Sequence, residues 1–152
     1  VLKPVTGISA LAELTVSEFE KNKNLLSPTV AKRTAHVVYE SERVARAAVA
    51  MKTGDMLLLG KLLNESHASL RDLYEVTGKE LDTLQALAQS HPACAGSRMT
   101  GAGFGGCTVS LVKSSAKKDF EKFVLENYKT KIGYEAECYE AEISDGITVE
   151  RV

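Results

Sequence analysis

The chain has 152 residues, of which 44% are hydrophobic and 26% are charged, and its formal net charge is −1. This length and composition are enough to bury a proper core as one domain. Basic and acidic residues are interspersed, so no electrostatic footprint for nucleic acid or an anionic membrane appears. The apolar runs are too short to span a bilayer. We therefore expect a globular domain that has neither nucleic acid nor a membrane as a partner.

The chain starts at Val1 in place of a methionine, and its first residues, "VLKPVTGIS", are polar and rich in turn formers, with no signal-peptide pattern. We expect it to be a fragment of a longer protein. Cys94, Cys107 and Cys138 cannot all pair, and none lies in a Cys-x-x-Cys arrangement. We expect reduced thiols and a cytoplasmic location.

The first half of the sequence predicts helices. Thr15 or Ser17 is suited to cap a short helix over residues 16–26, and Ser27-Pro28 opens a longer one that ends at the "TGD" of residues 53–55. Apolar residues repeat along this longer helix and predict one buried stripe, opposite a charged face. The stripe consists of Val30, Val37, Val44 and Met51, with Val38, Ala45 and Ala48 beside them, and the charged face of Lys32, Arg33, Glu40 and Arg43.

Two more helices follow. Asp55 is suited to cap a helix that keeps apolar spacing from Met56 to Leu73. The next helix is expected to begin at Thr77, because Thr77 and Glu80 have the spacing of a capping box.

After residue 97 the hydrophobic period changes to that of strands. Residues 107–112 and 139–143 alternate in polarity, and residues 147–152 form a last candidate strand after the "SDG" turn of residues 144–146. Between these strands, Phe120, Phe123, Val124 and Tyr128 share one helical face, with Gly133 as the stop. The pattern predicts an α+β fold, with an antiparallel sheet packed with helices on one face.

The glycine-rich segment "GAGFGG" of residues 101–106 matches the letters G-x-G-x-x-G. A dinucleotide fingerprint must follow a strand and open a helix, whereas here a strand follows, so we reject it. A P-loop needs a lysine after its glycines, and a protein-kinase lid needs further motifs; neither condition is met. From spacing alone, a structural hairpin and a phosphate-facing loop remain open.

Longer stretches resemble a known family. "GSRMTGAGFGGCTVSLV" (residues 96–112) resembles the third conserved motif of the GHMP small-molecule kinases, in its galactokinase form. "AKRTAHVVYESERV" (31–44), "NESHASLRDLYEVTGKELDTL" (64–84) and the closing "SDG" resemble the C-terminal domain of the same family in the same order. Ala102 and Leu73 depart from the residues that many relatives carry, without an expected effect on chemistry.

The resemblance implies a ferredoxin-like GHMP kinase C-terminal domain over residues 1–152. Galactokinases transfer the γ-phosphoryl group of ATP, with Mg²⁺, to the anomeric hydroxyl of galactose in a cleft between two domains. The catalytic base and the nucleotide loop belong to the N-terminal domain, so we expect no catalytic residue and no metal ligand in this chain, and no activity of the chain alone. The expected site residues form a glycine loop that lines the cleft: Met99, Thr100, Gly101, Ala102, Gly103, Phe104, Gly105 and Gly106.

Other residues receive structural interpretations. Phe104 is expected to pack or to form the wall, and His67 to be a hydrogen-bonded buried histidine in preference to a general base. Arg71-Asp72 is interpreted as an ion pair, and Cys107 as a small buried hydrophobe. Arg98 is suited either to approach a phosphate or to pair with a carboxylate on a helix.

Three other functions stay open at this point. They are a galactokinase-like sensor of sugar and nucleotide in transcriptional regulation, a kinase for N-acetylgalactosamine, and a scaffold domain with a coincidental glycine hairpin. We also expect an exposed apolar face where the chain packs on the N-terminal domain.

Overall fold

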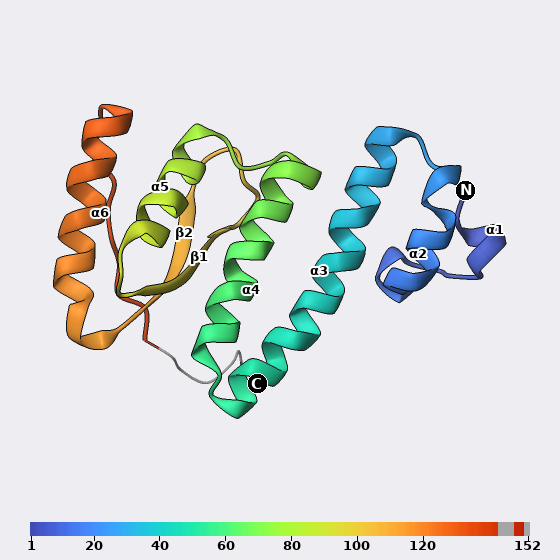
Figure 1. Cartoon of the computed structure of the whole chain (residues 1–152), viewed down its shortest axis with the longest axis horizontal. Helices are drawn as coiled ribbons and strands as arrows, with labels where there is room; N and C mark the ends of the chain where they lie inside the picture. Colours follow the sequence, from blue (N-terminus) through green and yellow to red (C-terminus); the bar gives the residue numbers. More distant parts are fainter. Residues whose placement is uncertain (143–147, 151–152) are drawn as a thin grey trace.

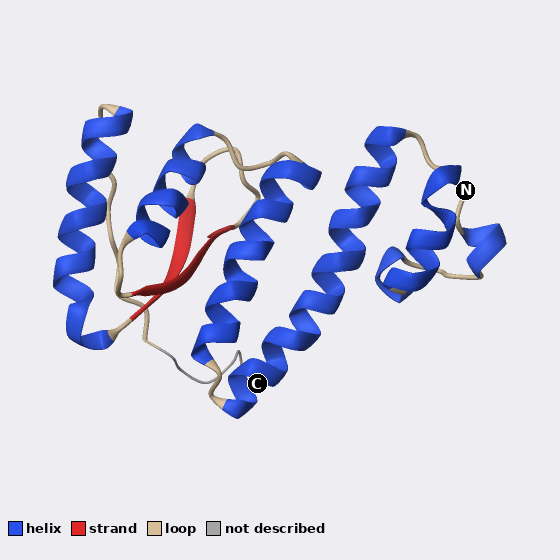
Figure 2. Ribbon diagram, in the orientation of Figure 1, coloured by secondary structure: helices blue, strands red, loops and turns tan. Residues whose placement is uncertain are grey.

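The computed structural model describes residues 1–142 and 148–150. Helices stand side by side around one β-hairpin, with the short N-terminal helices at one end and the last helix at the other (Figures 1 and 2). The elements in chain order are α1 (Lys3–Thr6), α2 (Val16–Asn22), α3 (Pro28–Thr53), α4 (Met56–Ser69), α5 (Lys79–Ser90), β1 (Cys94–Thr100), β2 (Cys107–Val112) and α6 (Lys117–Ile132). A π-helical turn, Leu70–Tyr74, extends α4. The described chain is therefore helical with a two-stranded antiparallel sheet, which confirms the α+β class.

Local capping signals set most helix ends. Thr15 accepts a hydrogen bond from the backbone of Glu18, whose carboxylate binds the Thr15 backbone in return, so α2 starts with a full capping box. Asp55 accepts from the Leu58 backbone at the start of α4, as predicted, and Gly54 ends α3 in the left-handed conformation. The box predicted at Thr77 is wrong: α5 begins two residues later, after Gly78, and Thr77 is buried.

Most of the apolar stripe of α3 is exposed, which contradicts the prediction that it is buried; Val38, predicted beside it, is buried. Val30, Val44 and Met51 are 49%, 60% and 58% exposed. The reason is that α4 covers the polar face of α3: Ser66 donates to Glu40 over 2.5 Å, and Ser69 pairs with the ring of His36 over 2.9 Å. Hydrogen bonds across this interface turn the stripe outward, and periodicity alone does not tell what covers a stripe.

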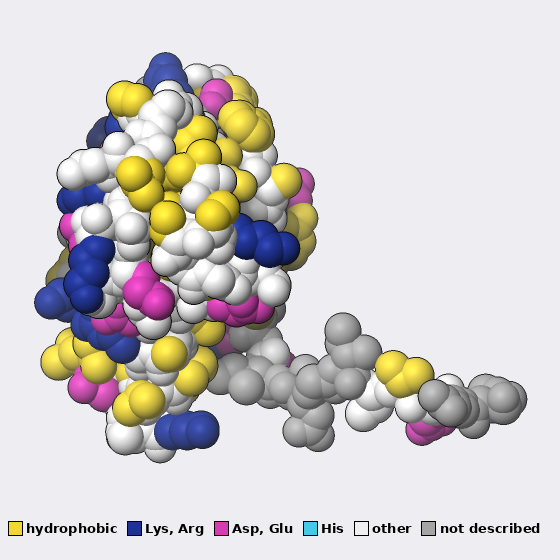
Figure 3. Space-filling view, turned by 90° about the vertical axis from the view of Figure 1, so that its right-hand side faces the viewer, with side chains coloured by type: hydrophobic (Ala, Val, Ile, Leu, Met, Phe, Trp, Pro, Cys, Tyr) yellow, Lys and Arg dark blue, Asp and Glu magenta, His cyan; other side chains and the backbone are white. Residues whose placement is uncertain are grey.

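The N-terminal segments pack on the first half of α3. Leu2, Leu14 and Phe19 form a buried cluster with Ala35 and Val38 of α3. Viewed from the side that carries α1 and α2, apolar side chains gather in a patch with charged side chains around it (Figure 3). This end of the chain is thus an extension built on α3, apart from the hairpin.

Helix α4 runs against β1 at very short range. A Cβ added to Gly60 would lie 2.2 Å from the carbonyl oxygen of Ala95, and one added to Gly96 would lie 2.0 Å from the carbonyl oxygen of Gly60. The β1–β2 register shifts between Cys94 and Gly96, as in a β-bulge. The absence of side chains on both elements therefore sets how closely the helix and the strand approach.

The strands predicted at the C-terminus are not formed in the described part. Residues 139–142 and 148–150 have no strand, and Tyr139 is 78% exposed. Residues 143–147 and 151–152, including the "SDG" turn, lie outside the described residues. Alternation marks residues that suit a strand, but it does not show that they pair: α4 occupies the outer edge of β1, and no described residue pairs with the outer edge of β2.

The last helix follows the sequence closely. Phe120, Val124 and Tyr128 are buried along α6, and Gly133 caps it with φ of 98°. Phe120 and Val124 form a cluster with Ala88 of α5. Among the described residues, none of the helices combines the length and apolar character of a membrane span.

We expect Gly60→Ala to destabilise the chain by about 1–3 kcal/mol, because its methyl group would overlap the Ala95 carbonyl. Helix propensity alone predicts the opposite sign, a gain of about 1 kcal/mol. Urea unfolding of the variant beside Lys61→Ala, an exposed neighbour on the same helix, measures the difference. A Gly60→Ala chain more stable than the wild type would contradict the close packing.

Candidate functional site

The glycine loop of residues 101–106 joins β1 to β2, whose last pair is Thr100 with Cys107. The N–H of Phe104, at the tip, donates to the carbonyl of Val76 over 2.7 Å. Val76 follows the π-helical turn, and its own N–H donates to the Leu70 carbonyl. The end of α4 therefore holds the tip of the loop.

Gly103 is required where the tip meets Val76. Its φ is 86°, and a Cβ there would lie 2.1 Å from the Val76 carbonyl oxygen. A side chain would thus be strained by conformation and blocked by backbone at once. The glycine pattern predicted this unusual backbone path, but it could not identify Val76 as the partner.

Phe104 points away from the body of the chain. It has a positive φ of 59°, uncommon for an aromatic residue, and its side chain is 81% exposed. Of the two predicted roles of Phe104, packing is contradicted within the described chain, because the hydrogen bond to Val76 fixes the backbone with the ring outward; the role in a wall stays a prediction. A strained residue with an exposed aromatic ring is often part of a functional surface.

Met99 and Thr100 lie in β1, at the root of the loop. Met99 is 1% exposed, and its side chain packs with Leu70 and Leu81. Of the predicted site residues, Met99 thus anchors the loop from within the core, while Thr100, Gly101, Ala102 and Gly106 are exposed.

The edge of β1 that faces away from β2 is covered by side chains of α4. The N–H of Ser97 donates to Asn64 Oδ1 over 2.9 Å, and the N–H of Met99 donates to His67 Nδ1 over 3.1 Å. Gln85 of α5 donates to the same Asn64 oxygen over 3.2 Å. These side chains satisfy an edge that would otherwise need a third strand.

His67 is the buried, hydrogen-bonded histidine that the sequence predicted. It is 1% exposed, and its Nε2 lies 3.0 Å from Asp82 Oδ1. Because a backbone N–H only donates, Nδ1 must accept from Met99, so Nε2 carries the proton and donates to Asp82. Burial lowers the pKa of His67, and this effect outweighs the opposing effect of Asp82.

Sequence reasoning missed Asn64, Asp82, Gln85 and Val76. The signal for the first three is polar side chains at positions where α4 and α5 face the sheet. Asn64 and His67 are three residues apart, so they share a helix face. Val76 acts through its carbonyl and leaves no signal in its side chain.

Arg98 pairs with a helix carboxylate. Its Nη1 lies 3.4 Å from Glu40 Oε1, and its Nε donates to the Met99 carbonyl over 2.9 Å. This settles which of the two predicted partners it takes within the chain. Arg71 and Asp72 form the predicted exposed ion pair, with Nε and Oδ1 2.8 Å apart.

The expectation that Cys107 is buried is wrong. Cys107 and Val109 lie exposed on β2. The half-buried side of β2 includes the polar Thr108 and Ser110, and Ser110 donates to the fully buried Ser97 over 2.8 Å. The three cysteines are free thiols, as predicted.

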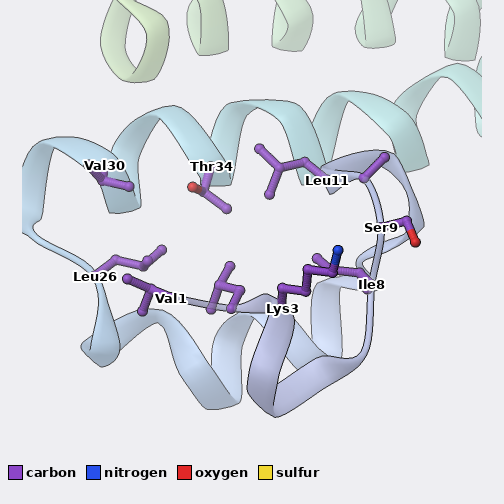
Figure 4. A pocket seen from close by; sticks show the side chains of 10 residues that line it. Val1, Lys3, Ile8, Ser9, Leu11, Leu26, Val30 and Thr34 are labelled. Carbon is purple, nitrogen blue, oxygen red and sulfur yellow. The ribbon is translucent and has the colours of Figure 1, made fainter.

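The described residues contain no cluster of three histidine, cysteine or acidic side chains that could hold a metal ion. A groove lies between α3 and the N-terminal segments, lined mainly by apolar side chains such as Leu11, Leu26 and Val30 (Figure 4). Lys3, Ser9 and Thr34 supply its polar groups. Its lining contains no acid, histidine or cysteine.

The chain matches the family model described as "GHMP kinases C terminal" over residues 47–130, which is more than half of its length. The chain belongs to the GHMP kinase family. The matched region contains α4, α5, the hairpin and most of α6, and therefore the whole glycine loop of this GHMP kinase domain.

Similarity to individual proteins is consistent with the family match. The chain is 51% identical to the galactokinase of Clostridium beijerinckii over 95% of its own length and 38% of that protein. It is 48% identical to the galactokinase of Lactococcus lactis over 93% of its length and 36% of the relative. The crystal structure of Lactococcus lactis galactokinase with galactose superposes with a TM-score of 0.85 at 44% identity, covering 88% of this chain and 35% of that one. This GHMP kinase chain thus spans a little over a third of the length of its relatives.

A matched pair of glycines tests the tip of the loop. Gly101 and Gly103 have the same φ, 85° and 86°, but a Cβ at Gly101 meets nothing within 4 Å. We expect Gly101→Ala to lower the free energy of unfolding by about 1 kcal/mol through strain alone. Gly103→Ala should lower it by a further 1–3 kcal/mol, on the order of other overpacked sites. Equal losses in urea unfolding would show that Val76 does not hold the tip.

Stability should fall in mild acid. Burial lowers the pKa of His67 and of His36, so the folded state holds both rings neutral while the unfolded chain titrates near pH 6.5. Below that pH the unfolded state binds more protons, and the free energy of unfolding decreases as the pH falls. We expect a lower urea midpoint at about pH 5.5 than at about pH 7.5, and a smaller difference in His36→Gln. A midpoint that rises toward acid would contradict this.

Proposed function

We propose that this chain is the C-terminal domain, residues 1–152, of a galactokinase that phosphorylates galactose at its anomeric hydroxyl with ATP. The supporting observation is that relatives named galactokinase match nearly the whole chain at about 50% identity, and that one solved relative binds galactose. The region that matches the family model, residues 47–130, includes the glycine loop and α4, which holds it. A sensor, scaffold or N-acetylgalactosamine kinase has no comparable observation in its favour.

In this proposal the glycine loop, Met99 to Gly106, forms one wall of the substrate cleft. Phosphoryl transfer depends mainly on positioning and on stabilising charge. A loop with almost no side chains lets the sugar and the phosphates approach the backbone, and its held tip keeps that surface in one place. The exposed ring of Phe104 completes the wall against the rest of the protein.

The loop itself contains no acidic, basic or histidine side chain. As the family resemblance implies, we assign the catalytic residues to the N-terminal domain of the complete protein, together with most contacts to ATP and Mg²⁺. When bound, Mg²⁺ neutralises charge on the phosphates. The loop residues do not fit a metal ligand set, so this chain contributes shape and backbone, and alone it should be inactive.

The remaining proposals concern the contact with the N-terminal domain and the cellular location. Exposed apolar side chains on α3 and α4, among them Val44, Met51 and Leu57, suit packing on the N-terminal domain. The free cysteines suit the cytoplasm.

The test is ATP-dependent phosphorylation of galactose by the complete protein that carries this chain. We expect turnover with galactose, none with this chain alone, and at least about a tenfold loss of kcat in Gly105→Val of the complete protein. Gly105 has positive φ and no neighbour within 4 Å, so the loss would report on the cleft.

Gly133→Val is the matched control. Gly133 also has positive φ and open space, but it caps α6 away from the loop. It should retain activity. No turnover by the complete protein, turnover by the isolated chain, or equal losses in the two variants would contradict the proposal.

A further inference from the structure

The position of the glycine loop depends on two contacts with the end of one helix. The tip binds the Val76 carbonyl just after the π-helical turn that extends α4, and the root binds His67 of α4 through the Met99 backbone. His67 therefore holds the strand that leads into the loop, on the same helix that holds its tip.

We propose that His67 is a positioning residue that fixes the glycine loop of the active site through the backbone of Met99. This inference rests on the proposed galactokinase function. His67 is 1% exposed, and it reaches the loop through its hydrogen bond to the backbone of β1.

A histidine suits this place because its two ring nitrogens do opposite tasks. Nδ1 accepts from the Met99 N–H over 3.1 Å, and Nε2 donates to Asp82 Oδ1, 3.0 Å away on α5. Asp82 thereby selects the tautomer that leaves Nδ1 free to accept. The ring joins α4, α5 and β1 at one point, one residue before Thr100 leads into the loop.

Substituting His67 with asparagine or with glutamine separates its contact with Met99 from its contact with Asp82. In His67→Asn, the amide oxygen lies near the place of Nδ1 and can still accept from Met99. In His67→Gln, the amide nitrogen reaches the place of Nε2 and can donate to Asp82, but the Met99 N–H loses its acceptor. The two variants therefore differ in the one contact that reaches the loop.

His91 is a matched control within the same chain. It is 6% exposed, its Nε2 lies 3.2 Å from Asp119 Oδ2, and its Nδ1 accepts from the Ala93 N–H over 3.2 Å. The ring packs against Phe120 and Phe123 of α6, just before the other end of β1. His91→Gln breaks an equivalent buried contact without touching the root of the loop.

The experiment compares kcat and KM for galactose in the complete protein, and the amide NMR signals of residues 99–106 in this chain, for the three variants. We expect His67→Gln to lower kcat about tenfold or more and to shift the loop amides. His67→Asn should recover most of that kcat. His91→Gln should lower the melting temperature as His67→Gln does, but leave kcat and the loop amides unchanged.

Losses of kcat that follow stability alone, equal in His67→Gln and His91→Gln, would overturn the proposal, and so would unchanged loop amides in His67→Gln. If His67→Gln does not fold, Asp82→Ala is used in its place. Shifted loop amides and a lower kcat in Asp82→Ala support the proposal, and the absence of both changes overturns it. If the unmodified complete protein does not phosphorylate galactose, the proposed function fails, whereas the amide signals still show whether His67 positions the loop.

Discussion

The structure depends on which groups accept hydrogen bonds from the backbone N–H groups along the outer edge of β1. In a two-stranded hairpin, every second N–H of each strand faces away from its partner and must find another acceptor. Here Ser97 and Met99 bind Asn64 and His67, so a helix takes the place of a third strand. This arrangement brings the α4 backbone onto β1, and it is why both Gly60 and Gly96 lack side chains where they meet.

The position of the glycine loop follows from the contact between α4 and the outer edge of β1. Once α4 holds β1, its π-helical extension lies beside the hairpin turn, and the Val76 carbonyl is in place for the Phe104 N–H. Gly103 is the residue that permits this contact. A segment that composition alone marks as flexible is thus held at its root and at its tip, as the proposed substrate-facing wall would require.

The sequence predicted features that depend on near neighbours. The caps at Thr15 and Asp55 and the stops at Gly54 and Gly133 were confirmed, because a few adjacent residues decide them. Predictions from the sequence failed where residues distant in the chain determine which side chains are buried or paired. Most of the stripe of α3 lies outward because α4 binds its polar face. Cys107 is exposed because Thr108 and Ser110 take the half-buried side of β2, and residues 139–142 form no strand in the described chain. For the site, the glycine pattern and the family resemblance indicated the loop, but the ring nitrogens of His67 acquire their tasks only when α4, α5 and β1 meet.

Amide hydrogen exchange of Met99 and Phe104 in this chain tests the central claim most directly. If α4 holds the loop at both ends, these two amides should exchange as slowly as those in the middle of α4, such as Leu62, because both are hydrogen-bonded and open only with the helix. If instead both exchange at the rate of unprotected amides, the loop is not held by α4, and the account of how this domain presents it is wrong.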